Sequence, residues 1–85
     1  MDRTEIVLRA VANSRRLAMV RELKRRQATV GDLAAMLRLS FPATSSHLRI
    51  LRSAGLVERR QRGLEMYYRI ADDQSRFIKR LLAII

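Results

Sequence analysis

Residues 29–70 read TVGDLAAMLRLSFPATSSHLRILRSAGLVERRQRGLEMYYRI, and this stretch decides the fold. It contains two short helical patterns joined by a tight turn at Arg38-Leu39-Ser40, followed by an Arg-rich hairpin with Gly63 at its tip. That order of elements is typical of a winged helix-turn-helix. We therefore predict an α+β, mainly helical fold, with a helix-turn-helix at about residues 29–54 and a C-terminal β-hairpin wing at about residues 57–70.

Polar residues and a glycine mark the ends of the two motif helices. Thr29 and Asp32 have the spacing of a capping box, in which a hydroxyl and a carboxylate accept hydrogen bonds from backbone amides of the first turn. Ser40 is placed to cap the second helix, and Gly55 supplies a helix stop. The second helix is therefore expected at about residues 41–53.

The helix at residues 41–53 has two different faces. Its buried stripe is expected to comprise Phe41, Thr44, Leu48 and Leu51. The opposite face carries small and polar side chains, which allow a helix to approach the floor of a DNA major groove. An ordinary solvated helix face has the same composition, but the adjoining basic hairpin favours DNA. The predicted DNA-binding residues, including two from the hairpin and one from the preceding helix, are Ser40, Pro42, Ala43, Ser45, Ser46, His47, Arg49, Arg60, Arg62 and Arg16.

An Arg-rich helix precedes the motif. Asn13 with Ser14 offers a break and a cap, and Leu17, Val20 and Leu23 then recur on an inward face. The other face is basic, and either a solvated helix face or direct phosphate contact accounts for it. Its members are Arg15, Arg16, Arg21, Lys24, Arg25 and Arg26.

Terminal helices are expected at about residues 3–12 and 73–85, and Asp72 or Asp73 can cap the latter. The last helix carries two neighbouring apolar stripes, a wider apolar arc than packing on a small domain requires. We infer that the terminal helices join a homodimer; an alternative is that the arc packs on a segment downstream of Ile85. The predicted dimer contacts are Ile6, Val7, Ala10, Phe77, Ile78, Leu81, Leu82 and Ile85.

The composition favours a polyanionic partner. The 85 residues suit one domain, residues 1–85, and contain 18 Lys plus Arg against 8 Asp plus Glu, a formal charge of +10. Sixteen of those 18 residues are Arg, whose guanidinium makes bidentate contacts with phosphate and with guanine. Nucleic acid is thus favoured over an acidic membrane surface. We expect no membrane partner, because no apolar run approaches the roughly 20 residues of a bilayer span.

Metal and catalytic chemistry find little support in the sequence. The chain has no cysteine, so disulfides, thiolate ligands and a thiol redox switch are excluded. His47 is the single histidine, which is too few for a zinc site, and Asp72-Asp73 is better explained as a helix cap. Ser45, Ser46 and His47 are adjacent, but no oxyanion turn or orienting acid accompanies them. We expect a soluble, unprocessed cytoplasmic protein that is not an enzyme and has no cofactor.

Several motifs together resemble the ArsR-type (arsenic-repressor-like) transcriptional regulators. They are residues 13–17 (NSRRL), 29–34 (TVGDLA), 40–57 with the ending L-x-x-L-x-x-A-G-L-V, 62–63 (RG) and 67–69 (YYR). The resemblance covers nearly the whole chain. It implies a dimer joined by terminal helices, recognition helices in successive major grooves of a palindromic operator, and repression that a ligand relieves.

The chain departs from this family in two places. Metal-sensing members commonly carry a Cys-x-Cys-type site in the helix that here reads Gly31-Asp32-Leu33-Ala34-Ala35, or Asp and His ligands in the last helix, and neither set is present. Phe41-Pro42 replaces a common polar pair at the start of the recognition helix, which leaves the base preference open.

The leading hypothesis is a sequence-specific, double-stranded DNA-binding regulator, a dimeric repressor that does not sense metal through cysteine. Two alternatives are a winged helix that serves as a protein-interaction or assembly module, and a nonspecific nucleic-acid-binding protein. The sequence specifies neither an operator nor a small-molecule effector.

Overall fold

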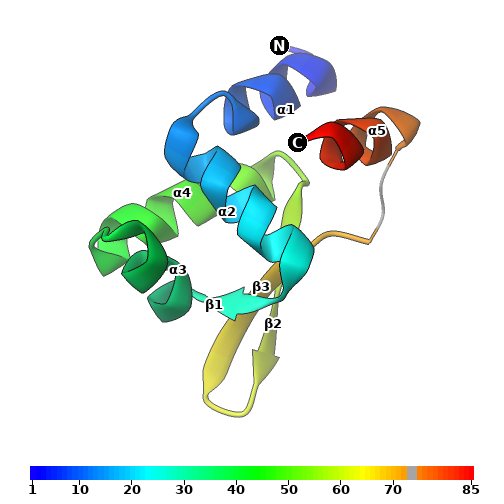
Figure 1. Cartoon of the computed structure of the whole chain (residues 1–85). Coiled ribbons are helices and arrows are strands. Elements are labelled where there is room, and N and C mark those ends of the chain that lie inside the picture. The colour runs from blue at the N-terminus through cyan, green and yellow to red at the C-terminus, as the bar shows by residue number, and fades with distance from the viewer. Residues whose placement is uncertain (73–74) are drawn as a thin grey trace.

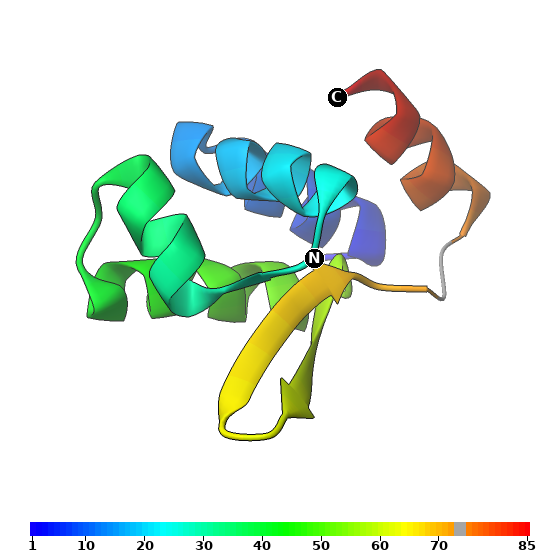
Figure 2. The same cartoon turned by 60° about the horizontal axis from the view of Figure 1, so that its bottom comes forward.

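The computed structural model describes residues 1–72 and 75–85, and it confirms the predicted winged helix-turn-helix (Figure 1). The helices and strands of the described residues follow in the order α1 (Arg3–Val11), α2 (Ser14–Arg25), β1 (Ala28–Thr29), α3 (Val30–Leu37), α4 (Phe41–Ser53), β2 (Val57–Arg62), β3 (Glu65–Ile70) and α5 (Arg76–Ile84). Figure 2 shows α2 and α3 above α4, with the β2–β3 hairpin extending below the helices. In these described ranges, no helix is both long and apolar enough for a membrane span.

The wing is part of a three-stranded antiparallel sheet with the order β1-β3-β2. The sequence predicted β2 and β3 but not β1, because two residues are too short to show a strand periodicity. β1 pairs Ala28 with Tyr68, and β2 places Arg59 opposite the same tyrosine. The pairing of Arg62 with Glu65 closes a two-residue loop whose first residue is glycine with φ 63°, as a tight hairpin turn requires.

The core lies where the three central helices meet the base of the sheet. Met19 of α2, Leu33 of α3 and Leu48 of α4 are each fully buried, as is Leu56 in the link to β2. The polar Thr44 is also fully buried, and its hydroxyl donates to the Ser40 carbonyl at 2.9 Å. Burial of that hydroxyl is tolerated because it has a hydrogen-bond partner.

Most of the expected helix ends are confirmed. Asn13 accepts from the amides of Arg15 and Arg16, Thr29 and Asp32 form the predicted capping box, and Ser40 accepts from the amide of Ala43. Gly55 ends α4 with φ 79°, and the amide of Leu56 donates to the Leu51 carbonyl, as in a Schellman motif. The capping residues could be predicted because each acts within three or four residues of its own position.

Two expectations about individual residues are wrong. Phe41 is 61% exposed rather than part of the buried stripe of α4; as the first residue of that helix it borders an open hollow beside the start of α3 and strand β3. The N-cap of α5 is Ser75, whose hydroxyl accepts from the amide of Ile78, so Asp72 is not the cap. Asp72 instead forms an ion pair with Arg69. Asp73 lies outside the described residues.

The terminal helices are attached to the core by part of the set that was predicted to form the dimer. Val7 and Ala10 of α1 and Ile78 and Leu82 of α5 are buried within a single chain. They therefore fix the two helices on their own domain and are not available at its surface. Figure 1 shows both helices at the opposite end of the molecule from the hairpin tip.

Arg38 ends α3 in the left-handed backbone region, with φ 56°. An L side chain in this conformation costs roughly 1–2 kcal/mol, whereas glycine adopts it freely but loses more chain entropy on folding. We expect Arg38→Gly to raise the free energy of unfolding by about 0.5–1 kcal/mol in urea denaturation. Arg38→Ala is the control, because it removes the same side chain and keeps the strained φ. Equal stabilisation by both variants would contradict this explanation.

Candidate nucleic-acid interface

The outer face of α4 is small, polar and accessible, as predicted. Pro42, Ser46, Arg49 and Ser53 are exposed, while Ala43 and Ser45 are half-buried. The hydroxyl oxygen of Ser40 accepts from the amide of Ala43 at 3.2 Å, so this serine positions the start of the helix. The face can approach a partner closely because it lacks bulky side chains over most of its length.

A basic hollow of about 310 Å³ lies between α4 and the wing. Its lining residues are Ser45, Arg49, Arg52, Arg59 and Tyr68. The first three of them share one face of α4, since they are spaced four and three residues apart. Arg59 reaches the same place because the strand register sets it opposite Tyr68. Three guanidinium groups and two hydroxyl groups that surround one hollow are suited to bind an anion such as a phosphate.

The sequence did not single out Arg52 and Arg59 as site residues. The spacing of Arg52 from Arg49 was available as a helical signal. Arg59 has no such signal in the sequence, because the register that brings it to α4 depends on the tertiary fold. The set of candidate phosphate ligands therefore grows by two.

A second hollow, of about 530 Å³, is lined by two carboxylates and by no arginine or lysine. It lies between the starts of α3 and α4 and strand β3, and its lining residues are Thr29, Val30, Gly31, Asp32, Phe41, Leu64, Glu65, Met66 and Tyr67. Hydrogen bonds from the backbone and side chain of Thr29 lower the pKa of Asp32, which stays ionised. A hydrogen bond to Glu65 and the charge of that carboxylate raise the pKa of Tyr67. Two carboxylates disfavour phosphate here, so the basic hollow is the better place for a nucleic-acid backbone.

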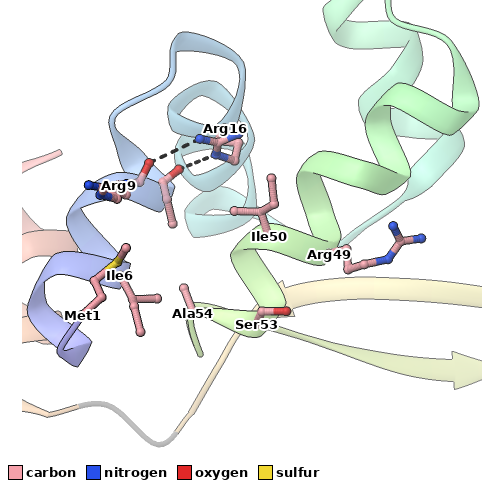
Figure 3. Close-up of a pocket in the computed structure, with 9 residues that line it drawn as sticks. Met1, Ile6, Arg9, Arg16, Arg49, Ile50, Ser53 and Ala54 are labelled. Carbon is pink, nitrogen blue, oxygen red and sulfur yellow. Dashed lines mark hydrogen bonds between the residues drawn. The ribbon is translucent and has the colours of Figure 1, made fainter.

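Arg16 has partners within the protein. Its Nε donates to the Ala10 carbonyl at 2.7 Å and its Nη2 to the Arg9 carbonyl at 3.3 Å (Figure 3). Its Nη1 lies 3.3 Å from Nδ1 of His47. The guanidinium that the sequence assigned to DNA thus joins the end of α1 to α4.

His47 is half-buried on α4 beside this arginine. Burial lowers its pKa, and the positive charges of Arg16 and then Arg15 lower it further. The imidazole is therefore neutral at pH 7, and Nδ1 can accept the hydrogen bond from Arg16. In this state His47 supports the position of α4 without adding a positive charge to its surface.

The predicted wing residues are exposed along β2. Arg60 lies 3.5 Å from the carboxylate of Glu58, and Arg69 shares that carboxylate at 3.3 Å. Arg62 is the last residue of β2, and its guanidinium carbon lies 5.8 Å from the centre of the Tyr67 ring, within the range of a cation–π contact. Arg62 is thereby held next to the hairpin tip with its charge free of the Glu58 carboxylate.

An apolar hollow of about 330 Å³ separates α1 from the C-terminal half of α4 (Figure 3). Ile6 lines it together with Ile50, so this residue of the predicted dimer set lies beside α4. Arg49 also borders this hollow, but in Figure 3 its side chain points away from Met1 and Ile6. Its guanidinium is thus available to the basic hollow.

The outer face of α5 is apolar and accessible. Phe77 is 38% and Ile84 81% exposed, and both line a shallow hollow of about 400 Å³ with Leu81, Arg76 and Arg80. Ile85 is half-buried against the core. Of the two stripes expected on this helix, one faces the core; in the other, Phe77 and Ile84 are exposed and Leu81 is half-buried against the core.

Within residues 1–72 and 75–85, no group of three or more His, Asp or Glu side chains is arranged to hold a metal ion.

Comparison with known proteins points to one family. The family model described as "Bacterial regulatory protein, arsR family" matches residues 13–59. The chain is 36% identical over 80 residues to the biofilm growth-associated repressor of Agrobacterium fabrum, covering 93% of this chain and 68% of that protein. It is 39% identical over 72 residues to the transcriptional repressor SmtB of Mycobacterium tuberculosis, covering 85% of this chain and 53% of the relative.

A solved structure supports the same relationship. The homodimeric winged helix-turn-helix DNA-binding domain of a possible ArsR-family regulator from Mycobacterium bovis superimposes with a TM-score of 0.85 at 35% identity. The alignment covers 98% of this chain and 74% of that one. The two curated relatives are longer than the chain, which spans about half to two thirds of their length.

The environment of His47 predicts a pH dependence of stability. Because the folded-state pKa lies below the ordinary value, the unfolded chain takes up this proton first, and stability falls as pH falls from about 7.5 to about 5.5. We expect His47→Gln to lack most of this loss in urea denaturation, since Gln can still accept from Arg16. Glu22 and Asp32, whose pKa values are also lowered, titrate below this window. Equal pH slopes in the two proteins would refute the assignment to His47.

Proposed function

Because the chain belongs to the arsR family of bacterial regulatory proteins, we propose that it is a dimeric, sequence-specific repressor whose helix α4 enters the DNA major groove. As a member of this family the protein is a winged-helix DNA-binding regulator and not an enzyme. The parts that we propose are the residues in contact with DNA, the dimer surface, the repression and a cytoplasmic location.

The observation that carries the DNA-binding mode is the basic hollow between α4 and the wing. Arg49, Arg52 and Arg59 offer a phosphate three guanidinium groups at one place, adjoining the small polar face of α4. A phosphate held there fixes the register of the backbone and brings Pro42 and Ser46 to the base edges. In a twofold dimer the two α4 helices then meet successive major grooves about 34 Å apart on a palindromic operator.

The exposed face of α5 is the proposed dimer surface. Phe77 and Ile84 form an accessible apolar patch beside the half-buried Leu81, on a helix that its other face already attaches to the core. The similar domain from Mycobacterium bovis is described as homodimeric. Such a patch is costly in water and is stabilised when a second copy covers it.

Repression is proposed from the two curated relatives, both of which are named repressors. A dimer that occupies an operator prevents other proteins from using the same grooves. Because residues 1–85 contain no cysteine, no thiol within them takes part in the proposed repression.

The first test is DNA binding by fluorescence anisotropy across a salt series, with a palindromic duplex selected from a random library and a scrambled duplex. We expect a preference of about a thousandfold or more for the selected duplex, with two chains per site. Arg49→Ala, Arg52→Ala and Arg59→Ala should each weaken binding about tenfold and reduce the salt slope by about 1.

Lys79→Ala provides the matched control for these variants. It also removes one exposed positive charge, but from α5, which lies at the opposite end of the molecule from the hairpin tip (Figure 1). Equal, steeply salt-dependent binding to both duplexes would indicate a nonspecific role. Salt-resistant binding to a protein, with no affinity for DNA, would indicate an interaction module.

The dimer surface is tested by Ile84→Lys, which places a charge in the proposed contact. We expect a dimer for the wild-type protein and a monomer for this variant in sedimentation velocity, with an unchanged circular dichroism spectrum because Ile84 is outside the core. Ala83→Lys is the control, since it adds the same charge to an exposed neighbouring position that does not line the α5 hollow. A dimer that survives Ile84→Lys would exclude this face.

A further inference from the structure

The tip of the wing carries an apolar side chain that folding does not use. Leu64 is 102% exposed, the highest value among the large apolar residues that the structure describes. It occupies the second position of the two-residue loop, where a polar residue such as Asn, Asp or Ser commonly follows glycine. Neither the core nor the turn accounts for a leucine at this position.

The tip is also unusually thin. Gly63 contributes no side chain, and a Cβ built on it would meet nothing within 4 Å. Leu64 is therefore the only side chain of the loop, between strands that end at Arg62 and Glu65. A narrow tip with one projecting apolar group has the shape that a DNA minor groove, about 6 Å wide, can admit.

The charges around the tip favour DNA as its partner. Arg62 adjoins the loop and is held over the Tyr67 ring, so a positive charge stands immediately behind the leucine. Glu65 is paired with Arg62 in the strand register, and its carboxylate interacts with the Tyr67 hydroxyl, whose pKa it raises. The hairpin also extends below the helices on the side where α4 lies (Figure 2), so a duplex that meets α4 passes the tip.

We propose that Leu64 is an apolar wedge that enters the minor groove beside each half-site and partly unstacks one base step. This inference rests on the proposed DNA-binding function and adds a residue that reads the deformability of the DNA. Apolar side chains inserted in this way kink a duplex toward the major groove. Flexible steps such as TA and CA/TG unstack most easily, so the wedge would create a preference at bases that α4 does not touch.

The experiment uses the selected palindromic duplex with 2-aminopurine placed in turn at each flanking adenine. Fluorescence of this base rises when it unstacks. We expect at least a twofold rise at one flanking position per half-site with the wild-type protein and with Leu64→Met, which keeps an apolar side chain of similar volume. Leu64→Ala and Leu64→Lys should give no rise. Leu64→Ala should bind at most about tenfold more weakly, because the gain from burying the leucine is offset by the unstacking cost.

Three results would overturn the proposal. The first is a wild-type complex in which no flanking base responds although the duplex is bound specifically. The second is an undiminished response with Leu64→Ala. The third is a response retained with Leu64→Lys together with a steeper salt slope, which would mean that the tip only follows the phosphates. If the wild-type protein binds no duplex at all, the proposed function fails and the wedge fails with it. Specific binding without a fluorescence response means that the wedge alone fails.

Discussion

Burial of one face of α4 is the constraint on which the rest of the structure depends. Thr44, Leu48 and Leu51 are fully buried, and each leucine contributes about 1.5–3 kcal/mol by leaving water. Since a helix is rigid, fixing this face also fixes the opposite one. Pro42, Ser46 and Arg49 are thus presented at the surface in a set orientation that needs no contribution from their own side chains.

The many arginines of the chain are used in different ways. Arg16 satisfies carbonyls at the end of α1, and Arg69 bridges two carboxylates. Arg49, Arg52 and Arg59 instead converge on one hollow. The net charge of +10 therefore indicates attraction to a polyanion, while the division between internal and surface roles decides where that polyanion is held.

The terminal helices show the same division between a buried and an exposed face. Ile78 and Leu82 attach α5 to its own domain, and Phe77 and Ile84 remain accessible on the other side. The sequence assigned both apolar stripes to one dimer contact. In the structure one of them packs on the core of its own chain, and the other has its two ends exposed. A periodicity count finds apolar residues but does not state which of two neighbouring stripes faces the core.

The sequence by itself determined the order of the helices and the hairpin, the N-terminal caps of α2, α3 and α4, and the buried residues Thr44, Leu48 and Leu51 of α4. These features depend on interactions between residues that are close in the chain, and their patterns are visible in the letters. Only the tertiary structure decided the strand β1, the exposure of Phe41, the internal role of Arg16 and the meeting of Arg59 with α4. Each of these depends on contacts between segments that are distant in sequence, where packing and strand register decide which side chain is covered and which partner it meets.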